Sequence, residues 1–451
     1  MRNKYKRPNT MLREKISIPR LVWGVIGIFV LLYVFLIVLQ GSRRKESFQV
    51  RSVRHHHFPE LEHVEEENLQ VPPPRKRSAR AVKRKPKKPT TIIDEFLDEN
   101  SQLRNFFFPQ STFDHGNDSF FYPGRIWLDT DGHAIQAHGG GIIFDERSST
   151  YYWYGEYKDG PTYHAHKRGA ARVDIIGVGC YSSKDLRAWK NEGLVLKAEE
   201  ADEAHDLFVL NVLERPKVMY NDRSAKYVMW MHIDDANYTK AAVGVAISDY
   251  PTGPFQYLGS KRPHGFESRD MTVFKDDDGT AYIVYSSADN SELHVGELTR
   301  DYLDVTAVVG RVLVDRRREA PAVFKYQGTY YMISSGCTGW APNEAFAHAS
   351  ESMLGPWELL GNPCVGGNQL LREATFFAQS TFVLPLPEFP GVFIFMADRW
   401  NPADLGDSRY VWLPLIVDGP PDRPLDYNFG FPYWSRVAIY WHRKWKLPSK
   451  E

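Results

Sequence analysis

The stretch REAPAVFKYQGTYYMISS, residues 318–335, joins a short polar head to a hairpin signal. Apolar residues follow the head, a Tyr326-Gln327-Gly328 turn interrupts them, and a second apolar run extends from Tyr330 to Ile333. Two apolar runs around a glycine-containing turn are typical of a β-hairpin. The carboxylate of Glu319 therefore stands at the start of a strand that we expect to be buried.

Four other stretches share this organisation of head, strand, turn and aromatic-rich second strand. They are HGGGIIFDERSSTYYWYGE (138–156), ERPKVMYNDRSAKYVMWMH (214–232), RDMTVFKDDDGTAYIVYSS (269–287) and QSTFVLPLPEFPGVFIFMADRW (379–400). The five units recur every 49 to 76 residues, and further strand candidates at 177–196 and 242–255 lie between them. Repetition of one hairpin unit at this period predicts an all-β fold, a five-bladed β-propeller over residues 106–451.

The polar heads of the units are expected to meet. In a propeller the first strands of all blades lie side by side around one axis, so their starting residues converge at one end of the central channel. The heads are His138-Gly139-Gly140, Glu214, Arg269-Asp270, Arg318-Glu319 and Gln379. The alternative is that single heads only cap strand ends or pair with arginines, as Glu319 could do with residues 316–318.

At this point the sequence resembles the glycoside hydrolase family 43 propellers, in particular the exo-β-1,3-galactosidase subgroup and its membrane-anchored plant members. The resemblance covers about residues 120–445 and rests on GGGIIFDERSSTYYWYGE, CYSSKDLRAW, ERPKVMYN, SRDMTVFKDDDGTAYIVYSS and REAPAVF in this order. It implies an inverting O-glycosyl hydrolase, similar to a galactan 1,3-β-galactosidase, that acts on galactan side chains of cell-wall glycoproteins.

The resemblance also implies roles for single residues. Asp270 matches the aspartate that tunes the pKa of the acid, and Glu319 matches the general acid. The usual first-blade aspartate is replaced here by the head at His138, as in the galactosidase subgroup, where a fifth-blade glutamine orients or activates the water. Gln379 matches that glutamine, and Glu214 matches a glutamate that contacts the sugar.

Physical chemistry supports part of this assignment. Glu319 has apolar neighbours in sequence and would lie near Asp270 on the adjacent blade, and both effects raise the pKa of a carboxyl group, as a proton donor near neutral pH requires. A neutral amide is a poor base, so Gln379 is expected to position water. The imidazole of His138 is the alternative base.

Further residues are expected to bind the substrate. Glu156 and Glu214 can accept hydrogen bonds from sugar hydroxyls through both carboxylate oxygens. Tyr238, Asn290 and Trp340 follow the second, third and fourth hairpins, where an aromatic-lined cleft could hold a pyranose. His138 completes the predicted substrate-binding set. We expect no cofactor, no metal ion and no nucleic-acid partner; the expected partner is an oligo- or polysaccharide.

Other functions remain open at this stage. An arabinofuranosidase or xylosidase of the same family is one alternative, although the missing first-blade aspartate argues against it. A propeller that binds glycans without cutting them is another. The Asp276-Asp277-Asp278 run fits the acidic motif of metal-dependent glycosyltransferases, but it occupies a hairpin turn, where solvated aspartates are common.

The N-terminal part has a different composition. Residues 21–39 carry no charge, and nineteen helical residues span roughly 29 Å, the thickness of a bilayer core. We expect a cytoplasmic tail (1–20), a transmembrane signal-anchor (21–40) and a disordered stem (41–105) that is rich in charge and proline, with nine basic residues from Arg75 to Lys88. This order is typical of a single-pass type II protein of the Golgi membrane whose catalytic domain faces the lumen.

The cysteines and glycosylation sequons give weaker signals. The three cysteines, Cys180, Cys337 and Cys364, are too few for a disulfide framework. They are expected to be small buried hydrophobes, with a Cys337–Cys364 bridge as the alternative. Sequons begin at Asn117 and Asn237.

Overall fold

The computed structural model describes residues 91–98, 101–110, 112–113, 119–164, 171–418 and 436–449. The predicted tail, the predicted membrane segment and the predicted stem up to residue 90 lie outside these ranges. The chain divides into two compact units, residues 1–71 and 72–451, and all described residues belong to the second. Within the described ranges, no helix combines the length and the apolar character needed to cross a membrane.

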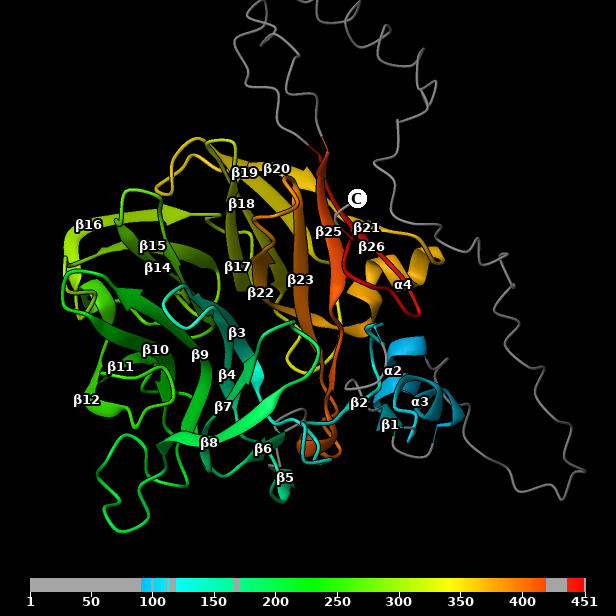
Figure 1. Ribbon diagram of the computed structural model, residues 1–451, viewed down its shortest axis with the longest axis horizontal. Helices are drawn as coiled ribbons and strands as arrows, with labels where there is room; N and C mark the ends of the chain where they lie inside the picture. The colour runs from blue at the N-terminus through cyan, green and yellow to red at the C-terminus, as the bar shows by residue number, and fades with distance from the viewer. Residues whose placement is uncertain are drawn as a thin grey trace, which may run out of the picture. The chain divides into compact units, whose positions relative to one another are not determined.

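Five sheets follow one another along the chain, which confirms the predicted all-β propeller (Figure 1). Blade 1 contains β3 (His138–Asp145), β4 (Thr150–Glu156), β7 (Gly177–Ser183) and β8 (Lys190–Lys197); blade 2 contains β9 (Val212–Asn221), β10 (Lys226–Asp234), β11 (Ala242–Ser248) and β12 (Gln256–Lys261); blade 3 contains β13 (Met271–Lys275), β14 (Ala281–Ser287), β15 (Glu292–Leu298) and β16 (Val305–Val312); blade 4 contains β17 (Arg318–Tyr326), β18 (Thr329–Gly336), β19 (Phe346–Ser350) and β20 (Glu358–Gly361). These four sheets are antiparallel throughout.

Blade 5 is built from more distant parts of the chain. Its strands are β22 (Gln379–Pro385), β23 (Val392–Arg399), β25 (Leu413–Asp418) and β26 (Arg436–Tyr440), with the short β24 (Arg409–Tyr410) beside β23 and β21 (Cys364–Val365) parallel to β26. The remaining short elements are α2 (Ile92–Leu97), α3 (Gln102–Phe107), α4 (Gln369–Glu373), η1 (Pro263–Gly265), η2 (Thr375–Phe377), η3 (Leu405–Asp407), the pair β1 (Thr112–Phe113) and β2 (Ile126–Trp127), and the pair β5 (Thr162–His164) and β6 (Ala171–Val173).

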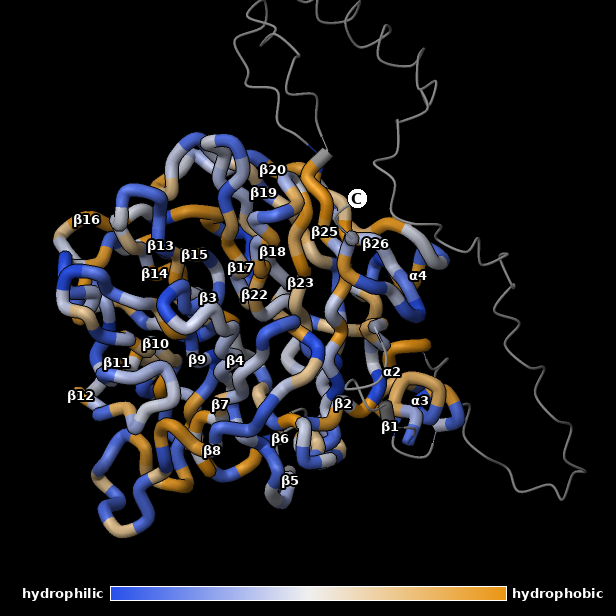
Figure 2. The backbone as a smooth tube through the Cα atoms, viewed as in Figure 1, coloured by the Kyte–Doolittle hydropathy of each residue, from blue (hydrophilic) through white to orange (hydrophobic). Residues whose placement is uncertain are grey.

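The first strands of the blades form a closed ring. Neighbouring pairs β3–β9, β9–β13, β13–β17, β17–β22 and β22–β3 are in contact, and Figure 1 shows β3, β9, β17 and β22 near the middle with β12, β16 and β20 towards the rim. Hydrophobic residues run along the strands, most clearly along β25 in Figure 2. Burial of apolar area between adjacent blades is the main favourable term for such a ring.

The closure between blades 1 and 5 uses both ends of the described chain. Phe121 and Trp445 stack with ring centroids 4.7 Å apart. They belong to one buried cluster with Trp153 of blade 1 and Trp412 of blade 5. Aromatic side chains bury large apolar areas, so this cluster seals the ring where the first and last blades meet.

The segment before the propeller differs from the predicted stem. Helix α2 begins with a capping box between Thr91 and Asp94, and α3 follows it directly. Phe96 and Phe107 are 2% and 5% exposed and pack in the cluster shared by blades 4 and 5. The composition predicts disorder over residues 41–105, whereas Ile92–Leu97 and Gln102–Phe107 are helical, because their aromatic side chains pack against the hydrophobic surface of blades 4 and 5.

Candidate active site

The polar heads lie at irregularities in the first strands. The pairing register shifts after His138 in β3, after Glu319 in β17 and after Ser380 in β22. The residues that follow His138, Glu214 and Glu319 have left-handed backbones, with φ of 61° at Gly139, 53° at Arg215 and 52° at Ala320. A bulge re-aims the side chain beside it. The irregular backbone after His138, Glu214 and Glu319 therefore turns each of these head residues away from the regular pleat of its strand.

Asp270, Glu319 and Gln379 come together as the ring geometry requires, and Arg215 joins them. Arg215 Nε lies 2.7 Å from Asp270 Oδ1, and Arg215 Nη2 donates to Gln379 Oε1 at 2.7 Å. Gln379 Nε2 donates in turn to Glu319 Oε1 at 3.1 Å. Three side chains from blades 3, 4 and 5 thus lie in one hydrogen-bonded network around a guanidinium from blade 2.

The amide of Gln379 is fully used by the protein. Its oxygen accepts from Arg215 and from Trp400 Nε1 (2.9 Å), and its nitrogen donates to Glu319 and to Ser335 Oγ (3.0 Å). A primary amide has two acceptor and two donor positions. A water molecule can therefore bind to Gln379 only in place of one of these four partners.

Glu319 is held in a state suited to keeping its proton. The side chain is 9% exposed, and its Oε2 accepts from Asn290 Nδ2 at 3.3 Å. Burial, followed by the negative charge of Asp270, raises the pKa of Glu319 to about 8, against the opposing charge of Arg215. Loss of hydration and a nearby like charge both disfavour the carboxylate form. Glu319 can therefore donate a proton at neutral pH.

Glu214 lies in the opposite kind of surroundings. Its Oε1 accepts from the Tyr238 hydroxyl at 2.7 Å, and its Oε2 lies 3.1 Å from His232 Nδ1. Burial by itself would raise the pKa of Glu214, but the hydrogen bond and charge of His232, together with the charge of Lys158, lower it to about 2. Glu214 is therefore a permanent anion at the wall of the site.

His232 is held as the cation in this arrangement. Its Nε2 lies 3.0 Å from Oδ2 of Asp234. The other carboxylate oxygen of Asp234 accepts hydrogen bonds from three backbone N–H groups. Burial disfavours the charged ring, yet the bonds to Asp234 and Glu214 raise the pKa of His232 to about 9. The chain Asp234–His232–Glu214 fixes the orientation of the Glu214 carboxylate.

Glu156 of blade 1 is also engaged by the protein. Lys158 Nζ lies 2.6 Å from its Oε2, and the backbone N–H of Arg215 donates to its Oε1 at 2.9 Å. Burial raises the pKa of Glu156, and the charge of Lys158 opposes this shift. Both carboxylate oxygens therefore already have protein partners, unlike the free bidentate acceptor expected from the sequence.

A buried lysine lies beneath these groups. Lys217 is 2% exposed, and its Nζ donates to the carbonyl of Gly139 at 2.6 Å and to that of Arg215 at 3.4 Å. Burial and the charge of Arg215 lower the pKa of Lys217 to about 7. The two carbonyl groups belong to Gly139 of blade 1 and Arg215 of blade 2, the left-handed residues described above. Lys217 therefore connects the irregular segments of these two blades.

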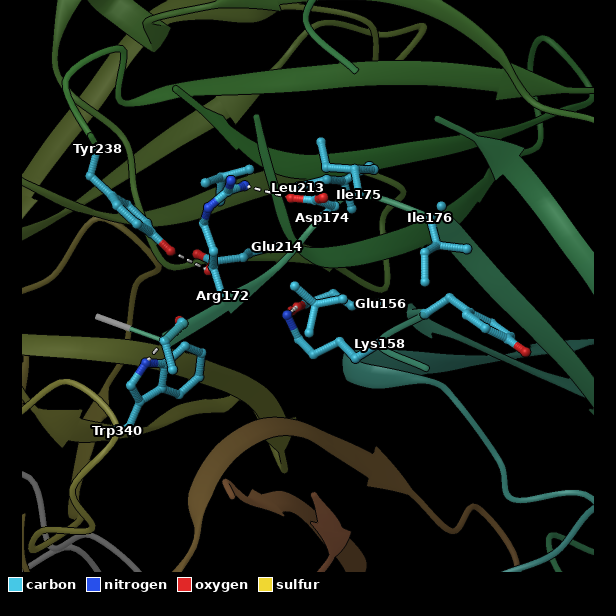
Figure 3. Close-up of a pocket in the computed structure, with 15 residues that line it drawn as sticks. Glu156, Lys158, Arg172, Asp174, Ile175, Ile176, Leu213, Glu214, Tyr238 and Trp340 are labelled. Atoms are coloured by element: carbon cyan, nitrogen blue, oxygen red, sulfur yellow. Dashed lines mark hydrogen bonds and ion pairs between the residues drawn. The ribbon is translucent and has the colours of Figure 1, made fainter. Parts of the chain in front are cut away.

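A pocket is lined by both Glu156 and Glu214 (Figure 3), whereas Asp270, Glu319 and Gln379 are not among its lining residues. Tyr238 and Trp340, two of the predicted substrate-binding residues, also line it. Trp340 Nε1 donates to the carbonyl of Ala171 at 3.2 Å, which links the loop after β18 to the β5–β6 hairpin across the pocket. An acidic wall opposite an indole ring is a suitable surface for a pyranose.

His138 does not reach this pocket in the structure. Its ring is 0% exposed and stacks on Tyr410 with centroids 4.9 Å apart. Among the described residues neither ring nitrogen has a hydrogen-bond partner, and the nearest carboxylate oxygen, on Asp398, is 3.8 Å from Nδ1. The imidazole therefore packs as an aromatic group below the site, which leaves it without access to substrate or water here.

The structure also shows the surroundings of the acidic turn 276–278 and of the three cysteines. Asp276 of the turn between β13 and β14 is paired with Lys325 at 2.5 Å, and the adjacent Asp277 is exposed. All three cysteines are unpaired, so the alternative Cys337–Cys364 bridge is absent. Cys337 lies near the acid, where its thiol donates to the Asn290 carbonyl at 3.6 Å.

Sequence reasoning missed several residues of the site. Arg215, Lys158 and Trp400 were not predicted, although each lies within two residues of a predicted hairpin end or head. Arg215 directly follows Glu214, and Lys158 follows Glu156 by two positions. A basic residue close to an acidic residue at a hairpin head or end is the signal that could have found Arg215 and Lys158, because buried carboxylates need a cationic or hydrogen-bonding partner. Trp400 gave no such signal.

Comparisons with known proteins identify the family. Residues 146–370 match the model of glycosyl hydrolases family 43. A family 43 β-1,3-galactosidase solved with galactodeoxynojirimycin is 40% identical, with 72% of this chain and 100% of that chain covered and a TM-score of 0.63. A second family 43 β-1,3-galactosidase is 36% identical, with 73% and 64% covered and a TM-score of 0.63.

A further similar structure comes from a fungus. It is a form of the exo-β-1,3-galactanase from Phanerochaete chrysosporium with β-1,3-galactotriose, and it is 35% identical, with 73% of this chain and 68% of that chain covered and a TM-score of 0.60. No match was found among curated protein sequences. The family model, the identities and the shared propeller lead to one conclusion: this chain belongs to glycosyl hydrolases family 43.

Proposed function

We propose that the protein is an inverting glycosidase that releases galactose from β-1,3-linked galactan. The observation that carries the proposal is a buried Glu319, with a pKa raised to about 8, within one network with Asp270 and Gln379. The β-1,3-galactosidases and the β-1,3-galactotriose complex among the similar structures favour this substrate over other family 43 substrates.

Glu319 is proposed to protonate the leaving oxygen. Departure of that oxygen requires a proton donor that is still protonated near pH 7, and the raised pKa of Glu319 meets this requirement. Asp270 supplies the negative charge that keeps the proton on Glu319. The positive charge of Arg215 opposes this increase in the pKa of Glu319. The same guanidinium pairs with Asp270 and fixes its position.

Gln379 is proposed to position the attacking water once the substrate is bound. Inverting glycosidases separate acid and base by about 6.5–9.5 Å, to leave room for water and sugar. In the free protein Gln379 Nε2 instead donates directly to Glu319 Oε1 at 3.1 Å. We propose that substrate binding exchanges this bond, since Glu319 has to turn to the leaving oxygen, and that the freed amide N–H then holds the attacking water through its oxygen. The proton that this water loses on attack passes to solvent water, because a neutral amide cannot accept it, and Glu319 is reprotonated from solvent.

The terminal galactose is proposed to occupy the pocket of Figure 3. Glu214 is the strongest acceptor there because it remains ionised. Tyr238 and Trp340 line the same pocket and would contact the ring, and Glu156 would contribute through its lone pairs that Lys158 and Arg215 leave free. Asn290 would act through Glu319, to which it donates.

The proposal is tested by galactose release. The full chain, purified in detergent, is incubated with β-1,3-galactan and with β-1,3-galactotriose, and Glu319→Gln is the control. Release of galactose by the wild-type chain alone supports the proposal. Release only from arabinofuranosides or xylosides would assign another family 43 activity, and binding of galactan without release would identify a glycan-binding propeller.

We also propose that the protein is anchored in the Golgi membrane, with the propeller in the lumen. The support is the uncharged run 21–39, preceded by a basic N-terminal segment. The test is alkaline carbonate extraction of membranes from expressing cells, combined with protease protection of a C-terminal tag. Extraction of the intact chain into the soluble fraction would reject the anchor.

A further inference from the structure

Three consecutive non-glycine residues before Gln379 have a left-handed backbone. The φ angles of Thr375, Phe376 and Phe377 are 49°, 57° and 58°. This conformation is unfavourable for residues with a Cβ atom, which visit it singly rather than in runs. The run ends two residues before Gln379, the first residue of β22. The contacts that stabilise the run therefore also fix the position of Gln379.

Arg399 holds the carbonyl groups of this run. Its Nη2 donates to Phe376 O at 2.9 Å and its Nε to Phe377 O at 3.3 Å. The side chain is 4% exposed, and none of the described carboxylates lies within ion-pair distance of it. Its Nη1 donates to Phe107 O at 3.0 Å. The carbonyls of the run and of helix α3 therefore share one buried guanidinium.

The N-terminal helices cover the run from outside. The ring of Phe377 lies 4.1 Å from that of Phe107 and 5.0 Å from that of Phe96, measured between centroids. Arg104 Nη2 donates to Asn401 Oδ1 at 2.6 Å, which fastens α3 to the chain after β23. Phe107 thus contributes both its ring and its carbonyl to the same contact.

These contacts continue into the proposed active site. Arg399 lies between Asp398, which pairs with Gln379 across β22 and β23, and Trp400, which donates to the Gln379 amide. Phe96 lines a small pocket together with Gln379, Asp398 and Trp400. Helix α2 therefore contributes a wall to the space around the residue proposed to position water.

We propose that residues 91–110 are a clamp that belongs to the catalytic unit: the helices α2 and α3 hold the left-handed run 375–377 and thereby place Gln379. The role in catalysis rests on the proposed function of Gln379. Phe96, Phe107 and Arg399 are positioning residues, because they act on the site through Phe377 and the start of β22. A covering segment that only fills hydrophobic surface would not change the geometry of Gln379.

The test compares substitutions in the full chain. Phe96→Ala removes one ring of the clamp, and Phe106→Ala is the matched control, because Phe106 is 56% exposed in the same segment. Phe324→Ala is a second control: Phe324 is 3% exposed in the same hydrophobic cluster but stacks on Tyr331 and Phe393, away from the run. The melting temperatures of all variants are measured first, so that exchange and kinetics can be compared at one temperature at which every variant is folded.

Hydrogen exchange and kinetics then give separate readouts. The amides of Phe377 and Ala378, bonded to Ala374 O and Thr375 O, are expected to exchange at least tenfold faster in Phe96→Ala than in either control. On β-1,3-galactotriose kcat is expected to fall at least tenfold, with KM within about threefold, and Phe96→Leu is expected to restore most of it.

The two readouts separate the clamp from the proposed function. Faster exchange in a chain whose wild type releases no galactose would support the clamp and reject the activity. Unchanged exchange at these amides in Phe96→Ala would overturn the clamp whatever the activity. An equal loss of kcat in Phe324→Ala would also overturn it, because general loss of stability would then explain the effect.

Discussion

Glu319 and Glu214 occupy equivalent positions in two blades and have opposite properties. Each stands at the head of a first strand, and each is followed by a left-handed residue, Ala320 or Arg215. Yet the pKa of Glu319 is raised to about 8, whereas that of Glu214 is lowered to about 2. At neutral pH one side chain is an acid and the other an anion.

The difference arises from partners rather than from burial. Loss of hydration raises the pKa of both groups. Glu214 overcomes it with a protonated His232 and a tyrosine hydroxyl, whereas Glu319 has the charge of Asp270 nearby and no cation in direct contact among the described residues. His232 and Tyr238 of the same blade stabilise the charge of Glu214, whereas Asp270 of the neighbouring blade keeps the proton on Glu319. In the proposed function, one blade position therefore serves proton transfer in one copy and substrate binding in the other.

The largest effect is expected from Glu319→Gln, which removes the proton donor and keeps the shape. General acid catalysis typically contributes about 10²–10⁴-fold, so kcat on β-1,3-galactan should fall by that factor. An aryl galactoside whose leaving group needs no proton should lose much less. Equal losses on both substrates would mean that Glu319 is not the acid.

Glu214→Gln should affect binding more than chemistry. Hydrogen bonds to charged groups contribute about 1.5–3 kcal/mol, so KM for β-1,3-galactotriose should rise about 10- to 150-fold. The rise should be accompanied by a smaller loss of kcat than in Glu319→Gln. Steady-state kinetics of the two variants side by side provide the measurement; a loss confined to kcat would make the two glutamates alike.

Asp270→Asn should change the pH dependence. Because Glu319 must be protonated, kcat/KM is expected to fall as the pH rises through its pKa of about 8. Removing the negative charge of Asp270 favours the ionised form of Glu319, so this alkaline limb should move down by about one pH unit. An alkaline limb that stays in place would show that Asp270 does not tune the acid.

Tyr238→Phe should give the smallest effect. It removes one hydrogen bond to Glu214, while His232 continues to hold the other carboxylate oxygen. Because this bond acts on the substrate only through the orientation of Glu214, KM is expected to rise less than in Glu214→Gln, by about 2- to 12-fold. The variant Tyr250→Phe, at a 67% exposed tyrosine, is the matched control and should leave KM unchanged.

The hairpins and their heads could be predicted because their signals are local. The predicted unit 138–156 coincides with β3 and β4, and the unit 318–335 coincides with β17 and β18 to within one residue. The meeting of Asp270, Glu319 and Gln379 followed from the symmetry of a ring. His232 lies opposite Glu214 in the predicted hairpin 214–232, so its position follows from the hairpin itself. The effects of Lys158 on Glu214 and of Asp270 on Glu319 could not be predicted, because they act between blades.

The N-terminal segment shows the limit most clearly. Its composition up to residue 105 predicts disorder, and nothing in residues 91–110 indicates which surface would receive Phe96 and Phe107. That surface is built from blades 4 and 5 and from the left-handed run 375–377, whose carbonyl groups accept hydrogen bonds from Arg399.

Alternation of apolar residues and turn chemistry, which act over a few neighbouring residues, determined five hairpins with polar heads and hence the propeller. Only the tertiary structure decided which head keeps a proton, which carries a charge and which segment covers them. The physical reason is that hydration, Coulomb interactions and aromatic packing depend on distance in space, and the sequence specifies that distance only through the folded ring.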